Sequence, residues 1–196
     1  MENKSRKVKR IIKRIELGKK LRPNEISYTD SIKKRFRVSS LENLLQGMKP
    51  HQTSLVLAQA AVESGWGSSR FAIEGNNLFG IWTTANDPNV IKSLYDREEQ
   101  SIYVKKYPNI AESISHYFLT LGRHNAYKKF RAKRYEEKDV FELIEALDKY
   151  SERGDEYTSL LKKIVEWNDL QKYDSYTIDP NYISETNAIQ QLLKKQ

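Results

Sequence analysis

Residues 58–82, AQAAVESGWGSSRFAIEGNNLFGIW, decide the fold of this chain of 196 residues. They continue an apolar run that begins near Thr53. A run that is apolar nearly all round predicts a buried central helix, with Thr53 as its N-cap. Gly65 and Gly67 are expected to end this helix. Glu63 therefore falls in the last turn of a buried helix.

The segments on either side are predicted to be helical as well. Residues 38–50 place leucines on one face and are expected to stop at Gly47 and Pro50. Residues 68–75 are typical of a short helix closed by glycine. After Pro108 the apolar residues recur at helical spacing, and Asn or Asp precedes each stretch as a cap. These later helices are expected at 109–122, 139–150 and 155–170.

Residues 90–107, VIKSLYDREEQSIYVKKY, predict the one β element of the chain. Two runs rich in β-branched residues and tyrosine flank a polar turn near 96–100. The architecture is therefore expected to be mostly α, with one small β-hairpin.

The net charge of +8 belongs to the N-terminal segment. Residues 1–37 hold fourteen Lys and Arg against four acids, so the rest of the chain is close to neutral. Four apolar residues at helical spacing predict a short basic amphipathic helix there: Val8, Ile11, Ile12 and Ile15. Its apolar stripe could pack on the body, or its charge could attract an anionic wall or membrane surface. Nucleic acid is not an expected partner, because no DNA-binding motif accompanies the charge.

Several classes of chemistry are excluded by composition. The chain has no cysteine, so it has no disulfide, no Cys-based zinc site and no thiol nucleophile. His51, His116 and His124 lack metal-like spacing, and no metal or organic cofactor is expected. No apolar run approaches the roughly 18 residues that a membrane helix needs. The first thirty residues are too charged for a signal peptide, so an export signal is expected to be absent from this chain.

Glu63 is the strongest candidate for chemistry. Desolvation and the negative end of the helix dipole both raise the pKa of a carboxyl group in this position. Such a group holds its proton near neutral pH, as the general acid of a glycosidase must. A structural ion pair, for instance with Arg70, is the alternative that spacing leaves open.

Two adjacent motifs carry a resemblance to a known family: LAQAAVESGWGSSRFA at 57–72 and GNNLFGIW at 75–82. In order and spacing they resemble the signature of the peptidoglycan glucosaminidases, glycoside hydrolase family 73. Residues 109–131 and 150–170 resemble downstream helices of its Bax-like branch. The resemblance implies a lysozyme-like α+β fold and cleavage of the β-1,4 bond after N-acetylglucosamine in peptidoglycan glycan strands. It also implies Glu63 as the catalytic acid and a location in the cell envelope, periplasmic or extracellular.

The second catalytic acid is where the sequence departs from the better-known members of the family. They carry an acid on the hairpin just before its turn, and Asp96 occupies the nearest matching place. Glu98 is the second candidate, and a solvated turn without a catalytic role is equally open. Members of the family can also work with a single catalytic acid, with the substrate's own N-acetyl group as nucleophile.

Other site residues follow from the same resemblance. Tyr150 matches a family tyrosine expected beside the catalytic acid, and Tyr127 is carried over as a cleft residue. The groove is expected to be lined by Asn77, Phe79 and Trp82, with the aromatic rings stacking on sugars and the amide bonding an N-acetyl group. Trp66 is expected to pack behind Glu63 and keep it dry.

The expected organisation is a basic helical extension at 1–37, a lysozyme-like glucosaminidase domain at 38–172 and a C-terminal tail at 173–196 that packs on or extends from the domain. A monomer is expected. The alternatives are a muramidase or lytic transglycosylase on the same fold, and a glycan-binding module without catalysis.

Overall fold

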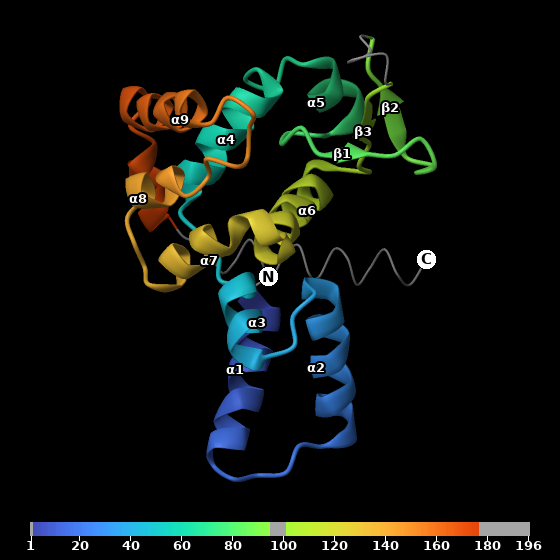
Figure 1. The fold of residues 1–196 in the computed structure, drawn as a ribbon, viewed down its shortest axis with the longest axis vertical. Helices are drawn as coiled ribbons and strands as arrows, with labels where there is room; N and C mark the ends of the chain where they lie inside the picture. Colours follow the sequence, from blue (N-terminus) through green and yellow to red (C-terminus); the bar gives the residue numbers. More distant parts are fainter. Residues whose placement is uncertain (1, 95–100, 177–196) are drawn as a thin grey trace.

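The helix α4, Thr53–Ser64, lies at the centre of the larger part of the molecule (Figure 1). In this computed structural model the described residues are 2–94 and 101–176. Leu55 and Ala58 of α4 are fully buried. Gly65 closes the helix in the left-handed conformation, with φ 56°, and its N–H donates to the carbonyl of Ala61. The predicted buried helix, with Glu63 in its last turn, is confirmed.

The other elements surround α4 or extend from it. The helices are α1 (Glu2–Glu16), α2 (Pro23–Phe36), α3 (Leu41–Met48), α5 (Arg70–Gly75), α6 (Ile110–Arg123), α7 (Lys128–Tyr135), α8 (Val140–Glu145) and α9 (Asp155–Trp167). Two 3-10 helices, η1 (Asn125–Tyr127) and η2 (Leu170–Ser175), and three strands, β1 (Trp82–Thr83), β2 (Val90–Lys92) and β3 (Tyr103–Lys105), complete the described part. The mostly α architecture is confirmed.

The main core lies between α4, α6, α8 and α9. Leu55, Leu121, Leu143 and Leu161 are buried in it, one from each helix. The four helices thus share one apolar interior, and α4 contributes to it along most of its length.

The N-terminus of α4 is held from the far end of the chain. The N-cap residue is Gln52 and not Thr53 as predicted, and its side chain makes no capping bond. Instead Asp174, in η2, accepts hydrogen bonds from the backbone N–H of Ser54 at 2.7 Å and from its hydroxyl at 2.8 Å. A capping carboxylate 120 residues away leaves no local signal in the sequence.

The β element is a three-stranded antiparallel sheet with the order β1-β3-β2. The predicted hairpin corresponds to β2 and β3, in which Ile91 pairs with Val104, and the sheet gains β1, in which Trp82 pairs with the same Val104. The carboxylate of Asp87 binds Lys105, and this hydrogen bond lowers the pKa of Asp87 to about 2. The loop before β2 is thereby tied to the central strand.

The N-terminal segment forms two helices that pack on α3 at one end of the molecule (Figure 1). Val8 and Ile11 of α1 are buried, whereas Ile15 is 43% exposed. Val8 joins a second apolar cluster, which consists of Val8, Ile32, Phe36, Leu44, Met48 and Leu119. The apolar stripe of α1 therefore packs on the body. The division of the chain at 37 and 172, and the contact of the basic residues with an anionic surface, stay predictions.

Gly47 lies inside α3 and does not end it as predicted. A Cβ atom at Gly47 would lie 2.7 Å from the carbonyl oxygen of Gly122, and one at Gly122 would lie 2.6 Å from that of Gly47. The two glycines therefore allow the backbones of α3 and α6 to touch.

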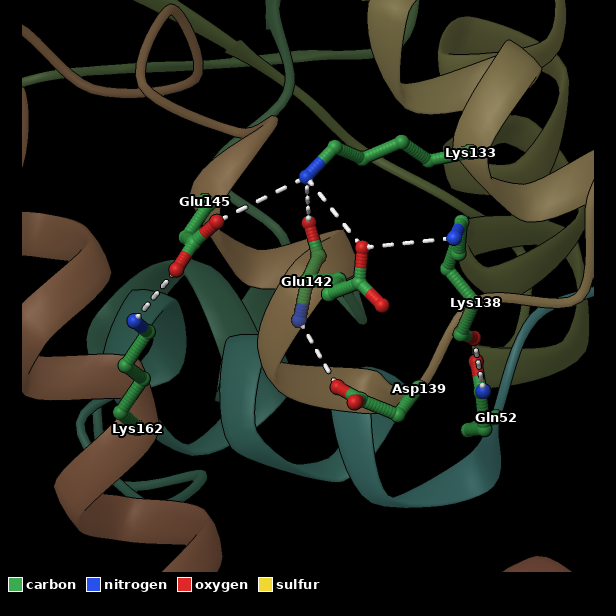
Figure 2. A network of polar contacts seen from close by, with 7 residues as sticks. All are labelled: Gln52, Lys133, Lys138, Asp139, Glu142, Glu145 and Lys162. Carbon is green, nitrogen blue, oxygen red and sulfur yellow. Dashed lines mark hydrogen bonds and ion pairs between the residues drawn. The ribbon is translucent and has the colours of Figure 1, made fainter.

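Figure 2 shows a network of polar contacts that joins α7, α8 and α9. Lys133 of α7 lies 3.6 Å from Glu145 of α8, and Glu145 lies 3.1 Å from Lys162 of α9. Asp139 caps α8 by accepting a hydrogen bond from the N–H of Glu142 at 2.9 Å. Surface ion pairs contribute little stability one by one, but a network fixes the relative positions of the helices.

Loss of the long-range cap should destabilise the fold. We expect Asp174→Ala to lower the free energy of unfolding by about 1 to 2 kcal/mol, because the first turn of α4 loses its acceptor. Asp148→Ala is the matched control, since Asp148 makes only a surface ion pair with Lys149, and it should cost less than about 0.5 kcal/mol. Urea denaturation of both variants measures the difference, and equal losses would contradict the capping role.

Candidate active site

A cleft of about 550 Å³ opens beside the C-terminal end of α4. Its walls come from five places in the chain: the end of α4, the turn before β1, α6, η1 and the loop before α9. The lining residues are Glu63, Phe79, Gly80, Ile81, Trp82, Thr120, Tyr127, Tyr150, Ser151, Glu152 and Arg153. Glu63, at the end of the buried helix, thus lies on a concave surface.

The carboxyl group of Glu63 is half-buried in this cleft. Burial raises its pKa, a hydrogen bond from the Tyr157 hydroxyl and the positive charge of Arg153 oppose the rise, and the pKa stays above its ordinary value. The predicted direction of the shift is confirmed. Arg70 contacts Glu74 and the carbonyl of Lys92, so the alternative of an ion pair between Glu63 and Arg70 is wrong.

The turn at Gly80 packs directly on the carboxyl group of Glu63. Gly80 has a positive φ of 59°, and a Cβ atom there would lie 3.2 Å from Oε2 of Glu63. A side chain at this position would meet both backbone strain and a close contact. The glycine therefore brings bare backbone against the acid.

Three tyrosines form the wall beside Glu63. The rings of Tyr150 and Tyr157 stack at 5.7 Å, and the ring of Tyr127 lies 5.9 Å from that of Tyr150. The hydroxyl of Tyr150 donates to the carbonyl of Phe79 at 3.2 Å, whereas that of Tyr157 bonds Glu63. The structure brings Tyr127 and Tyr150 to the cleft. It also assigns the contact with the acid to Tyr157, which sequence reasoning did not name as a site residue.

Asn77 does not line the cleft. It is 1% exposed, and its amide nitrogen donates to the carbonyls of Ile81 and Lys105 at 3.0 and 2.8 Å. Its amide oxygen accepts from the N–H of Ile81 at 3.1 Å. The expected bond to an N-acetyl group is corrected: the amide of Asn77 is used by the backbone, and it holds the turn that carries Gly80.

The aromatic residues of the two motifs do not all lie where the sequence predicts. Phe79 is 2% exposed and stacks on Tyr117 at 4.0 Å, so its ring belongs to the core and cannot lie on a sugar. Trp82 is 60% exposed at the edge of the cleft. Trp66 is 64% exposed and lines a separate groove with Leu57 and Tyr176, so the expected packing behind Glu63 is wrong. Helical spacing could not show this, because Trp66 follows the end of α4 with a positive φ of 58°.

Asp96 and Glu98 lie outside the described residues. Sequence reasoning did not name Glu152 and Arg153, which line the cleft from the loop before α9. Their signal is weak, since a polar stretch before a glycine is an ordinary turn.

The histidines have structural roles. His51 is close to the rings of Tyr117 and Phe130, His116 bonds the hydroxyl of Tyr107 at 2.6 Å, and His124 caps η1. Among residues 2–94 and 101–176, no group of three or more His, Asp or Glu side chains could hold a metal ion. Within the same residues, no helix has the length and apolar character required to cross a membrane.

A family model described as mannosyl-glycoprotein endo-beta-N-acetylglucosaminidase matches residues 42–195. Protein bax of Escherichia coli (strain K12) is 31% identical over 157 residues, in a match that covers 71% of this chain and 54% of that protein. The exo-glucosaminidase LytG of Bacillus subtilis (strain 168) is 29% identical over 154 residues, covering 72% and 55%. The chain thus spans about half the length of these curated relatives.

Solved structures share the fold. The catalytic domain of the autolysin Auto from Listeria monocytogenes aligns with a TM-score of 0.53 and 23% identity, over 79% of this chain and 90% of that one. This likeness agrees with the expected lysozyme-like α+β fold, which is confirmed.

The raised pKa of Glu63 should appear in the pH dependence of stability. Between the unfolded value of 4.5 and the higher folded pKa, the folded protein binds more protons than the unfolded chain. The contribution of Glu63 to the free energy of unfolding therefore falls as the pH rises through this window. We expect Glu63→Gln to gain stability relative to the parent protein between about pH 4 and about pH 7.

Glu145→Gln is the control with the opposite sign, because its hydrogen bond with Lys162 lowers the pKa of Glu145. The stability of this variant relative to the parent should fall as the pH rises toward the unfolded value of 4.5, and it should stay level above about pH 5. Urea denaturation at intervals from about pH 3 to about pH 7 measures the two differences. A pH-independent difference for Glu63→Gln would contradict the raised pKa.

Proposed function

The chain belongs to the glucosaminidase family, glycoside hydrolase family 73, and on this premise we propose that it cleaves the β-1,4 bond after N-acetylglucosamine in peptidoglycan, with Glu63 as general acid. One observation carries the proposal: a half-buried carboxyl group with a raised pKa lies in a cleft lined by tyrosines and an exposed tryptophan. The LytG relative is an exo-glucosaminidase, which supports the choice of bond.

The acid step follows from the surroundings of Glu63. Burial keeps the carboxyl group protonated at higher pH than a solvated glutamate, so it can give its proton to the glycosidic oxygen of the leaving sugar. The resulting carboxylate accepts the hydrogen bond of Tyr157 and is attracted by the positive charge of Arg153. These two groups thus stabilise the form of Glu63 that the proton transfer creates.

The sugar that loses its leaving group needs a second partner. A carboxylate on the β2–β3 connection can activate water or stabilise the positive charge that develops on the sugar ring, and Asp96 is the first candidate and Glu98 the second. With one acid, the oxygen of the substrate's own N-acetyl group attacks instead, and water then opens the cyclic intermediate.

The cleft offers contacts for the glycan on either side of the scissile bond. Trp82 presents an exposed ring that can stack on a sugar face, while Tyr127 and Tyr150 line the cleft near Glu63. Because the proposed substrate lies outside the cytoplasmic membrane, the proposed place of action is the cell envelope.

Replacement of the acid should abolish cleavage. We expect Glu63→Gln to keep the fold and to lower the release of new reducing ends from purified peptidoglycan by on the order of 10²- to 10⁴-fold, because the amide cannot donate the required proton. Glu74→Gln, an exposed residue of α5 that bonds Arg70, is the control and should retain activity. Retained activity in Glu63→Gln would rule out its role as the acid.

The products distinguish the bonds. Mass spectrometry should find N-acetylglucosamine at the new reducing ends. Muramic or anhydromuramic acid there would instead identify a muramidase or a lytic transglycosylase. Binding to sacculi without any new reducing ends would favour a glycan-binding module.

The turn at Gly80 offers a second test of the same site. We expect Gly80→Ala to lower the turnover number by on the order of 10- to 100-fold, because the added methyl group displaces the carboxyl group of Glu63. Gly18→Ala is the matched control: Gly18 also has a positive φ, 68°, but a Cβ atom there meets nothing within 4 Å. Both variants carry backbone strain, so both should lower the melting temperature, but only Gly80→Ala should lose turnover. Equal turnover in the two would contradict the contact.

A further inference from the structure

A line of buried polar side chains runs from Glu63 into the core, away from the cleft. We call it the buried polar chain, and it consists of Tyr157, Gln59, Tyr117, His51 and Arg134. Gln59 and Tyr117 are completely buried, Tyr157 and Arg134 are 1% and 2% exposed, and His51 is half-buried. Burying so many polar groups is costly unless every one finds a partner. None of them except Tyr157 takes part in the reaction described above.

Successive members of the buried polar chain lie within hydrogen-bonding distance. Arg134 Nη1 is 3.4 Å from His51 Nδ1, and His51 Nε2 is 2.9 Å from the Tyr117 hydroxyl. The Tyr117 hydroxyl is in turn 2.5 Å from Gln59 Oε1. At the other end of the same amide, Gln59 Nε2 is 2.8 Å from the Tyr157 hydroxyl. Glu63 lies one helical turn beyond Gln59 in α4, and hydrogen bonding from the Tyr157 hydroxyl lowers the pKa of its carboxyl group. From Arg134 to Tyr157, the members of the chain lie in α7, in the loop before α4, in α6, in α4 and in α9.

The direction of these bonds is set at the Arg134 end. A guanidinium group only donates hydrogen bonds, and burial lowers the pKa of Arg134 only to about 9, so it stays cationic at neutral pH. Its Nη2 is anchored by the carbonyls of Gln46 and Gly47 in α3, at 2.7 and 3.1 Å. His51 Nδ1 must therefore accept. Burial and the charge of Arg134 hold the pKa of His51 well below its usual value, so the ring is neutral with its proton on Nε2.

The remaining bonds follow one another. His51 Nε2–H donates to the oxygen of Tyr117, whose own proton is then given to Gln59 Oε1. This places the Gln59 amide with its nitrogen toward Tyr157, where it donates to the phenol oxygen. Because that oxygen already accepts, the Tyr157 proton is left for Glu63. Every bond in the chain thus donates toward the acid.

We propose that His51, Tyr117 and Gln59 are positioning residues that keep the hydroxyl proton of Tyr157 directed at the carboxyl group of Glu63. The inference rests on the proposed role of Glu63 as the acid. It means that the buried cation Arg134 acts on Glu63 through a series of hydrogen bonds, each of which donates in the direction of the acid. The consequence is a limit on how far burial can raise the pKa of Glu63, since a donor always faces its carboxylate.

Other groups that face Glu63 must be separated from this effect. They are Tyr127 from η1, and Tyr150, Glu152 and Arg153 from the loop before α9. Arg153 is the cation among them, but its side chain is 55% exposed, so solvent screens its charge. A neutral substitution deep in the buried polar chain leaves all these charges in place.

Tyr117→Phe tests the proposal with the loss of one oxygen atom. The ring can keep its stacking on Phe79, but nothing then holds the Gln59 amide in one orientation, and its oxygen can take the proton of Tyr157. We expect the pKa of Glu63 to rise by about one unit, which is the shift that loss of a hydrogen bond to a charged group produces. The alkaline limb of the pH–activity profile on peptidoglycan should move up equally. Direct titration of the Glu63 carboxyl by ¹³C NMR, assigned with Glu63→Gln, gives the same shift without any activity.

Tyr107→Phe is the matched control. Tyr107 is 5% exposed and bonds a histidine, His116, as Tyr117 bonds His51, but this pair lies outside the buried polar chain. Both variants should lose stability in thermal melts, because each removes a buried phenol–imidazole hydrogen bond. Only Tyr117→Phe should shift the titration of Glu63. A shift of the same size in both would assign the effect to general loosening of the core and overturn the proposal.

Two substitutions of His51 keep the test sound if Tyr117→Phe does not fold. His51→Gln can still accept from Arg134 through its oxygen and donate to Tyr117 through its nitrogen, so the Glu63 titration should stay within about 0.3 units of the parent value. His51→Leu removes that donor, and the pKa of Glu63 should rise. An unchanged titration in both His51→Leu and Tyr117→Phe overturns the proposal, even if Glu63→Gln is inactive. A shift in these variants supports it even if another residue proves to be the acid.

Discussion

The placement of the Glu63 carboxyl at the end of a buried helix is the constraint on which the rest of this structure depends. A carboxyl group that is half removed from water resists ionisation. It can act as an acid only if its surroundings still allow it to give up its proton. The molecule meets this requirement with backbone on one side and phenols on the other. Gly80 lets the turn before β1 pack on the carboxyl oxygen, and Tyr157 supplies one hydrogen bond. Among the residues that the structure describes, no cation forms an ion pair with Glu63, and the charge of Arg153 only moderates the rise of its pKa.

The helix that carries the acid is held at its N-terminus and in its middle by contacts from distant parts of the chain. At its N-terminus Asp174 provides the cap that the local sequence lacks, and in its middle Gln59 joins α6 to α9 through two tyrosines. A core made only of leucine would be cheaper to desolvate, but it would not fix the rotation of α4 about its own axis. Directional hydrogen bonds do fix it. We see the polar groups of this core as the means by which the acid is kept at one angle to the cleft.

Sequence reasoning succeeded where the signal is local. The apolar run and the glycines at 65 and 67 located α4, and the β-rich runs located β2 and β3. The motif residues Trp82, Tyr127 and Tyr150 do reach the cleft. The errors have a common origin. Asn77 and Phe79 belong to the motif, but one serves the backbone and the other the core, and Trp66 turns away because the chain leaves the helix in a left-handed conformation. A motif identifies residues that belong together without saying which of them face the substrate.

The sequence by itself determined the family, the mostly helical architecture and the position of one acid in the last turn of an apolar helix, because each of these depends on patterns within a few turns of chain. Only the tertiary structure decided which groups surround that acid. The contact of Tyr157 with Glu63, the cap from Asp174 and the series of donors that begins at Arg134 all join residues that are distant in sequence. Hydrogen bonds act over about 3 Å whatever the separation along the chain, so their partners are set by how helices pack and not by periodicity.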